Sequence, residues 1–178
     1  YNYIIYRNIS IEYWIYCFIL QKKYGDNIEI TLFKYINELE EAIINSPPDI
    51  LGMSNYVWCQ NISLELFKIF KERNSSGITI WGGPNFPLDL ESQEKFLKKH
   101  DIVDIYIPVE GETGFANVVE QCIKLDNNNL RQILSNSIEG CIVRNPKNEL
   151  KYKESRSPMI VNPIDIFFSV LSFIMNVS

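Results

Sequence analysis

The residues best suited to contact a ligand lie in three short segments, each of which follows an apolar run. The first segment, residues 54–58 (SNYVW), supplies a hydroxyl group, a carboxamide and two large aromatic rings. The polar groups can hydrogen-bond a phosphate or an amide, and Tyr56 and Trp58 can cover a flat ring system. The same two rings could instead close the top of the hydrophobic core. Both interpretations stay open on the residues alone.

The second segment contains two adjacent glycines, Gly82 and Gly83, followed by Pro84 and Asn85. Because glycine has no Cβ atom, it permits positive φ and lets another group lie directly against the main chain. The pair therefore indicates either a tight turn or the close approach of a ligand, and its local pattern favours neither. The third glycine and the Lys-Ser/Thr pair of the nucleotide-binding loops are missing, so NAD and ATP are weakly supported.

The third segment, residues 110–114 (EGETG), opens a helical pattern and offers Glu110, Gly111, Glu112 and Thr113. A carboxylate at the N-terminus of a helix is stabilised by the helix dipole without any ligand. For Glu112, helix capping is the favoured interpretation.

The cysteines and the single histidine give little support for metal or catalytic chemistry. Cys17, Cys59, Cys122 and Cys141 are far apart, and none belongs to a CxxC pair or another metal-ligand spacing. No protein-ligated metal site and no catalytic residue are therefore predicted. Each cysteine is expected to be a small core residue in a reducing cytosol. His100 follows a helical pattern among charged residues and is expected to be a solvated residue at the helix C-terminus.

Alternating strands and helices must position the three segments. Strands are predicted at residues 28–35, 49–56, 78–84 and 104–108, and helices at residues 36–45, 61–73, 90–99 and 114–125. Short links and continuous apolar strands are typical of a doubly wound parallel sheet that is buried on both faces. We predict an α/β, flavodoxin-like (Rossmann-like) sheet of five parallel strands, whose first strand is residues 3–6, followed by a helix at residues 11–23. In such a sheet, ligands bind beyond the carboxyl ends of the strands, where the three segments lie.

The remainder of the chain predicts an extension and a tail. We expect an α/β domain over residues 1–125, a linker and β-hairpin over 126–160, with strands at 140–144 and 150–153, and an apolar tail over 161–178 directed toward a missing domain. The run 166–175 has about ten residues, well short of the roughly twenty that span a bilayer. The chain starts at Tyr1 without signal-peptide features, so we expect a truncated, cytoplasmic protein that does not bind membranes. The net charge of −5, without a basic stripe, argues against nucleic-acid binding.

The ordered set PDILGMSNYVW, IWGGPNFP and VDIYIPVEGETGF resembles the N-terminal cobalamin (B12)-binding domain of B12-dependent radical SAM enzymes over about residues 26–160. The resemblance implies a corrinoid at the carboxyl edge of the sheet, with its nucleotide tail beside the glycines. By matching positions, Ser54 and Gly82–Gly83 would line the tail pocket, and Asn85 and residues 110–114 would flank the corrin ring. We also expect Tyr56 or Trp58 near the lower face of the ring. The candidate cofactor-binding residues are Ser54, Asn55, Tyr56, Trp58, Gly82, Gly83, Pro84, Asn85, Glu110, Gly111, Glu112 and Thr113.

Two departures from the family pattern limit what the resemblance implies. The Asp-x-His-x-x-Gly motif of other cobalamin domains is absent, so cobalamin is expected to bind without a histidine ligand. The Cys-x-x-x-Cys-x-x-Cys motif is also absent, so a 4Fe-4S cluster and S-adenosylmethionine would belong to a missing downstream radical SAM barrel, the expected partner domain. The chain is predicted to be a binding module of a methyltransferase or related radical enzyme. The alternatives are a flavodoxin-like domain that binds FMN or a nucleotide, and a remnant of the fold that binds nothing.

Overall fold

Strands and helices alternate through most of the chain in the computed structural model, which describes residues 28–108, 111–125, 129–153 and 172–177. The elements, in chain order, are β1 (Ile28–Phe33), α2 (Ile36–Asn45), β2 (Ile50–Ser54), α3 (Gln60–Arg73), β3 (Ile78–Gly82), α4 (Leu90–Lys99), β4 (Ile105–Ile107), α5 (Gly111–Ile123), the 3-10 helix η2 (Leu130–Ser135), β5 (Cys141–Arg144), β6 (Leu150–Lys153) and β7 (Ser172–Val177). The strand predicted at residues 3–6 and the helix predicted at residues 11–23 lie outside the described residues.

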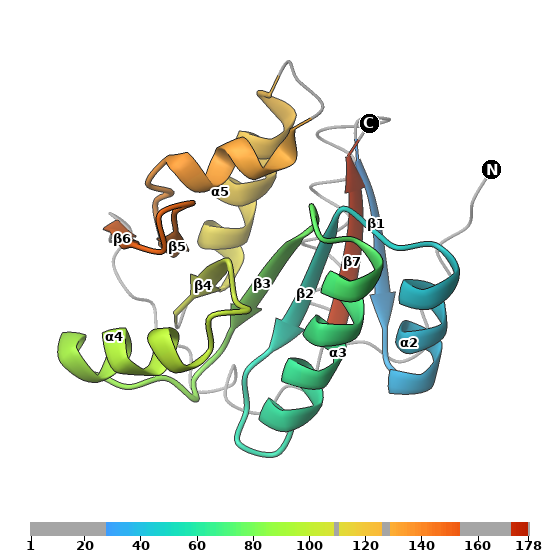
Figure 1. Cartoon of the computed structure of the whole chain (residues 1–178), viewed down its shortest axis with the longest axis horizontal. Coiled ribbons are helices and arrows are strands. Elements are labelled where there is room, and N and C mark those ends of the chain that lie inside the picture. The colour runs from blue at the N-terminus through green and yellow to red at the C-terminus, as the bar shows by residue number, and fades with distance from the viewer. Residues whose placement is uncertain (1–27, 109–110, 126–128, 154–171, 178) are drawn as a thin grey trace.

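The described strands form one mixed sheet in the order β1-β7-β2-β3-β4-β5-β6 (Figure 1). Strands β2, β3 and β4 pair in parallel, as the apolar runs predict. The α/β class is confirmed, but the sheet has seven described strands where five parallel strands were predicted. Four of the five predicted strands are described, as β1 to β4, and three strands that pair antiparallel, β5, β6 and β7, bring the sheet to seven. The predicted hairpin β5–β6 pairs with β4 through β5, and β7 pairs with both β1 and β2. The main-chain groups at the edges of β1, β2 and β4 therefore find hydrogen-bond partners within the sheet.

Part of the predicted apolar tail is therefore a strand inside the sheet. Residues 172–177 form β7, and its Met175 side chain is fully buried. This apolar segment pairs with a strand on each side and packs into the core, so the sheet of this chain itself covers it. The apolar pattern of the sequence did not reveal this pairing. Within the described part of the chain, no helix combines the length and apolar character needed to cross a membrane.

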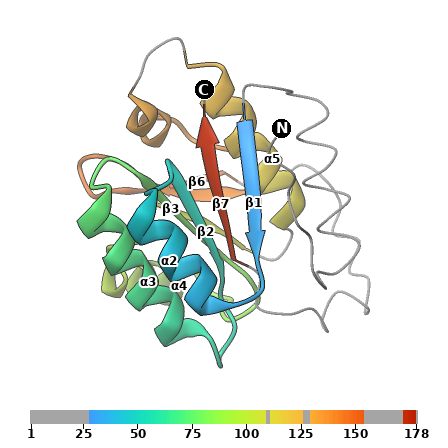
Figure 2. The same cartoon turned by 90° about the vertical axis from the view of Figure 1, so that its right-hand side faces the viewer.

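Alternate strand residues face two separate hydrophobic clusters. Ile80 and Ile107 lie in the cluster beneath α5 and η2. Trp81 and Tyr106, their neighbours in the chain, lie in the cluster beneath α2, α3 and α4. Figure 2 shows α2, α3 and α4 on one face of the sheet and α5 on the other. Burying each large apolar side chain contributes about 1.5–3 kcal/mol, so both helical layers hold the sheet that carries the loops.

A buried ionic cluster fixes the amino ends of β3 and β4. The Asp104 carboxylate accepts hydrogen bonds from the Lys71 ammonium at 2.5 Å, from the Thr79 backbone N–H at 3.0 Å and from the Arg131 guanidinium at 3.1 Å. Lys71 and Arg131 also donate to the Gly77 carbonyl. The cluster joins α3, β3, β4 and η2 at the edge of the sheet opposite to the candidate ligand-binding loops.

Candidate functional site

The parallel strands end in register, which brings the predicted ligand-contacting loops together. Ser54 of β2 pairs with Gly82 of β3, and Gly82 pairs with Ile107 of β4. The loops that follow these strands therefore start side by side at one edge of the sheet, toward the bottom of Figure 1. This is the carboxyl edge, where ligands of open parallel sheets bind.

Hydrogen bonds from Asn55 join the loop after β2 to the loop after β3. Its fully buried side-chain Nδ2 donates to the Asn85 carbonyl at 2.7 Å and to the Tyr106 hydroxyl at 2.9 Å. The Asn85 Nδ2 donates back to Asn55 Oδ1 at 3.2 Å, and the Tyr106 hydroxyl donates to the Gly83 carbonyl at 3.0 Å. The carboxamides of Asn55 and Asn85, predicted as ligand contacts, are thus engaged with each other and with the loop backbone.

Both glycines of the second segment are required by the chain's own backbone. Gly83 has a φ of +132°, and a Cβ atom there would lie 2.8 Å from the Asn55 carbonyl oxygen. A Cβ atom on Gly82 would lie 2.9 Å from the Ile107 carbonyl oxygen. Distances this short are not tolerated by real side chains, so the glycines let three neighbouring strand ends and loops approach one another. This close approach within the chain accounts for the pair without a ligand.

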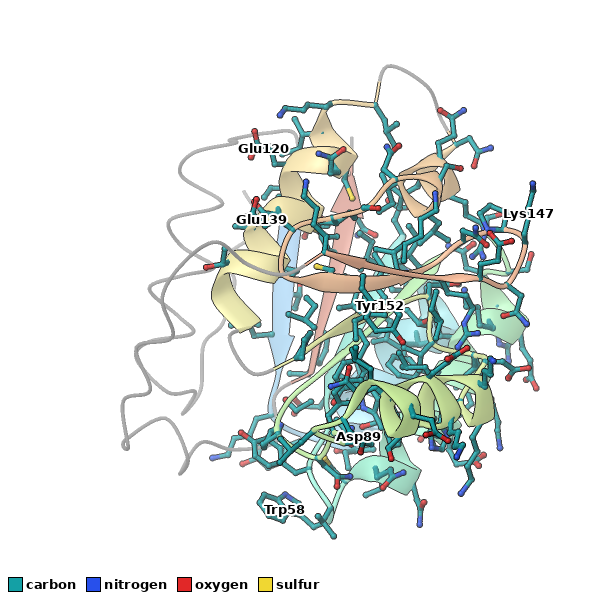
Figure 3. All side chains as sticks on the ribbon, turned by 90° about the vertical axis from the view of Figure 1, so that its left-hand side faces the viewer. Trp58, Asp89, Glu120, Glu139, Lys147 and Tyr152 are labelled. Carbon is teal, nitrogen blue, oxygen red and sulfur yellow. The ribbon has the colours of Figure 1, made fainter. Side chains whose placement is uncertain are left out.

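The aromatic pair of the first segment faces outward. The rings of Tyr56 and Trp58 stack with centroids 4.8 Å apart and an interplanar angle of 14°. The Trp58 side chain is 68% exposed, so it does not close the top of the core. Figure 3 shows Trp58 projecting from the lower edge of the molecule, beyond Asp89. Burial, together with the nearby Cys59, raises the pKa of the Tyr56 hydroxyl, which therefore stays neutral at physiological pH.

The side chains of Cys59, which precedes α3, and of Ser63 in its first turn hydrogen-bond the first segment. The Ser54 carbonyl accepts hydrogen bonds from the Cys59 thiol at 3.2 Å and from the Ser63 hydroxyl at 3.1 Å. The Tyr56 backbone N–H donates to the Cys59 sulfur at 3.4 Å. These contacts anchor both ends of the short turn, so the half-buried Tyr56 and the exposed Trp58 rest on a fixed backbone.

The third segment forms the first turn of α5 and lies against β4 and the chain entering β5. Gly111 begins this helix, Thr113 is half-buried, and Glu110 lies outside the described residues. A Cβ atom on Gly114 would lie 2.6 Å from Ile107 Cγ2 and 2.8 Å from the Gly140 carbonyl oxygen. This glycine therefore allows α5 to pack closely on β4 and on the chain entering β5.

The structure corrects the prediction for His100. The side chain is buried, not solvated, and its ring packs against Phe96 at 4.7 Å and Trp81 at 5.5 Å between centroids. Burial and the positive charge of Lys99 lower the pKa of His100, while Asp101 acts in the opposite direction. The charged neighbours misled the sequence interpretation, although the spacing of four residues from Phe96 places His100 on the same inner helical face.

Two residues near the site were missed from the sequence. Gln60 Oε1 accepts from Asn85 Nδ2 at 3.0 Å, and Gln60 Nε2 lies 3.5 Å from His100 Nε2. Tyr106, assigned only to a strand, carries its hydroxyl to the loops and stacks on Phe86 at 4.0 Å. A polar residue in the first turn of a helix after a candidate loop was a signal that could have indicated Gln60. We call Asn55, Gln60, Asn85 and Tyr106 the amide network.

The described cysteines are core residues, as predicted. Cys59, Cys122 and Cys141 are buried free thiols, and burial raises the pKa values of Cys122 and Cys141 to about 12. Cys17 lies outside the described residues. Among the residues that the structure describes, no three or more His, Cys, Asp or Glu side chains are grouped as metal ligands.

Comparisons with known proteins identify two partial relatives. The chain is 31% identical over 84 residues to the cobalamin-dependent radical SAM methyltransferase TokK of Streptomyces tokunonensis, a match to 47% of this chain and 12% of the relative. It is 32% identical over 72 residues to 2-(S-pantetheinyl)-carbapenam-3-carboxylate methyltransferase of Streptantibioticus cattleyicolor, a match to 40% of this chain and 10% of that protein. The chain thus spans about a tenth of the length of these relatives. No family model matches it.

Proposed function

We propose that this chain is a cobalamin-binding module of a B12-dependent radical SAM protein. The observation that carries the proposal is the 31% identity over 84 residues to a methyltransferase named as cobalamin-dependent. The fold supports it, because three parallel strands end in register and present their loops at one edge. Strands β2, β3 and β4 are buried on both faces, which holds that edge of the sheet in place.

The stacked pair of Tyr56 and the exposed Trp58 suits a flat macrocycle. Tyr56 and Trp58 stack on each other and leave most of the Trp58 surface open to solvent. Covering this surface with a corrin ring would remove apolar area from water, which contributes about 25 cal/mol per Å². We therefore place the lower face of the corrin against Trp58, with Thr113 and the first turn of α5 beside the ring.

The donor set fits cobalamin only without a histidine on cobalt. The chain has one histidine. It is buried against Phe96 and Trp81, on the face of the sheet that α2, α3 and α4 cover. When bound, cobalamin would supply the methyl-carrying cobalt, and the residues of this chain would bind and orient it. We propose that Ser54, Gly82, Gly83 and the exposed Pro84 present main chain to the nucleotide tail. Asn55 and Asn85 act mainly by fixing those loops.

The activity of the whole protein extends the same proposal. A downstream radical SAM barrel would hold the 4Fe-4S cluster and S-adenosylmethionine, and the parent would be a methyltransferase or a related radical enzyme. The exposed ring of Trp58, stacked on Tyr56, would also suit a flavin, which keeps FMN as the second candidate ligand.

The experiment that tests the proposal measures cofactor retention. The chain is mixed separately with hydroxocobalamin and with FMN, desalted, and examined by visible absorption. We expect retained corrin absorption, and Trp58→Ala should weaken retention about tenfold. Leu88→Ala is the control, because Leu88 is an apolar residue in the loop after β3 that is even more exposed than Trp58. Retention of flavin alone, or of neither compound, would overturn the cobalamin assignment.

A further inference from the structure

The amide network has a defined direction, because it starts from backbone carbonyls that can only accept hydrogen bonds. The Tyr106 hydroxyl donates its single hydrogen to the Gly83 carbonyl, so it can only accept from the Asn55 side chain. The atom of Asn55 that faces it must then be Nδ2, whose second hydrogen goes to the Asn85 carbonyl. Asn55 Oδ1 is left to accept from the Asn85 side chain, which must present Nδ2.

The same logic continues to the histidine. One hydrogen of Asn85 Nδ2 goes to Asn55, and the other goes to Gln60 Oε1 at 3.0 Å. Gln60 therefore turns its Nε2 toward His100, and the two nitrogens lie 3.5 Å apart. Since Gln60 Nε2 can only donate, His100 Nε2 must carry a lone pair. The network is complete only when His100 is neutral and its proton is on Nδ1.

We propose that His100 is a proton-sensitive positioning residue that, when neutral, holds Gln60, Asn85 and Asn55 in register and, when protonated, releases the loops after β2 and β3. An imidazolium presents N–H at Nε2, so two donors would face each other. The Gln60 carboxamide must then turn its oxygen toward His100, and Asn85 Nδ2 loses its acceptor. The disturbance reaches the Asn55 contact and the Gly83 loop through the same hydrogen bonds.

The surroundings of His100 set its charge state near physiological pH. The charged groups that line the same groove are Lys99 and Asp101 on its own segment and Glu65 and Lys68 of α3, which form an ion pair at 2.7 Å. Burial and Lys99 lower the pKa of His100 from 6.5, so the neutral form predominates at pH 7. The ring also packs against the uncharged aromatic side chains of Phe96 and Trp81. A further positive group, Arg144 of β5, donates to the Leu97 carbonyl at the end of α4.

Protons can reach the ring from solvent. His100 lines an open groove of about 360 Å³ between α3 and the end of α4. Asn61 and Leu64 of α3 and Ile102 after α4 line the same groove. The groove lies beside α3 and α4, at the His100 end of the amide network. The loops after β2 and β3 lie at its other end, at Asn55 and Asn85. A change of pH in the groove would thus reach these loops through the amide network.

Nuclear magnetic resonance of the ligand-free, ¹⁵N-labelled chain tests the proposal. Because His100 is the single histidine, its ring signals report one titration. Between about pH 8 and pH 5, we expect the side-chain amide signals of Asn55 and Asn85 to shift with the same midpoint as the His100 ring. The Asn117 side-chain amide, which donates to the Glu139 carbonyl on the other face of the sheet, is the internal control and should not follow.

Two variants separate transmission from a general loss of structure. In His100→Gln, a carboxamide oxygen can accept from Gln60 at any pH, so the shifts of Asn55 and Asn85 should disappear. In Gln60→Ala, His100 should still titrate, with a raised pKa, while the two amides no longer follow it. Amides that are unmoved in the wild type, or that still follow His100 in Gln60→Ala, would overturn the proposal.

The consequence for cofactor retention rests on the proposed function. If the wild type retains hydroxocobalamin, retention at pH 5.5 relative to pH 7.5 should fall several-fold more than in His100→Gln. If it retains none at either pH, the cobalamin assignment fails, whereas the amide titration still decides the role of His100.

Discussion

Replacing Gly83 with alanine tests whether the chain itself, in the absence of a ligand, requires glycine in the loop after β3. The residue has a φ of +132°, and an added Cβ atom would lie 2.8 Å from the Asn55 carbonyl oxygen. Backbone strain of this kind costs about 1–3 kcal/mol. Relieving the contact would displace Asn55, whose buried hydrogen bonds to Asn85 and Tyr106 contribute about 1 kcal/mol each. We expect Gly83→Ala to lower the free energy of unfolding by about 3–5 kcal/mol.

Urea unfolding of the ligand-free chain, followed by tryptophan fluorescence, measures this loss. A typical domain has only about 5–15 kcal/mol of stability, so the midpoint should move visibly while the slope with urea is kept. Leu88→Ala in the same loop is the control, and since Leu88 is fully exposed it should change stability by less than about 0.5 kcal/mol. An unchanged midpoint for Gly83→Ala would refute the intrachain explanation. If that variant also lost hydroxocobalamin, the glycine would instead be required by the ligand.

Three further outcomes follow from the buried polar groups. Asp104→Asn should lower the free energy of unfolding by about 3 kcal/mol, because it leaves Lys71 without its buried anionic partner, while cobalamin retention stays unchanged at the opposite edge; loss of retention at equal stability would contradict this. Since the folded pKa of His100 is lowered, folding disfavours its protonation, so its contribution to stability is complete above about pH 6.5 and is lost as the pH falls below that value. Equal pH slopes of the unfolding free energy in the wild type and in His100→Gln would argue against this. With pKa values raised to about 12, Cys122 and Cys141 should resist alkylation at pH 8 until the chain unfolds, as mass spectrometry would show.

The strands of the sheet centre were predictable because their burial dominates their sequences. Ile50–Ser54 and Ile78–Gly82 are short apolar runs, and the observed strands lie within the predicted ranges. The position of β7 was not predictable in the same way. Its pairing depends on main-chain contacts with strands that are far away in the chain. An apolar run does not indicate whether the segment packs against another domain or pairs within its own sheet.

The location of the candidate site was also predictable, but the hydrogen-bond partners of its side chains were not. The rule for parallel sheets selects the loops of Asn55 and Asn85, which the structure brings into contact. Residue type alone does not show whether a carboxamide faces a ligand or a neighbouring loop. The structure supplies that distinction for Asn55, and it moves His100 from the surface to the end of the same hydrogen-bond network.

The insertion of β7 between β1 and β2 has a kinetic consequence. The pairing is strongly non-local: the Asp49 backbone N–H donates to the Asn176 side chain at 3.3 Å, across 127 positions of the chain. Until the later segment arrives, the facing edges of β1 and β2 have no strand between them. Folding with such a high contact order is slow, and unpaired edges favour association between chains. The rate of refolding should therefore be limited by the docking of this strand, and aggregation during refolding should rise with protein concentration.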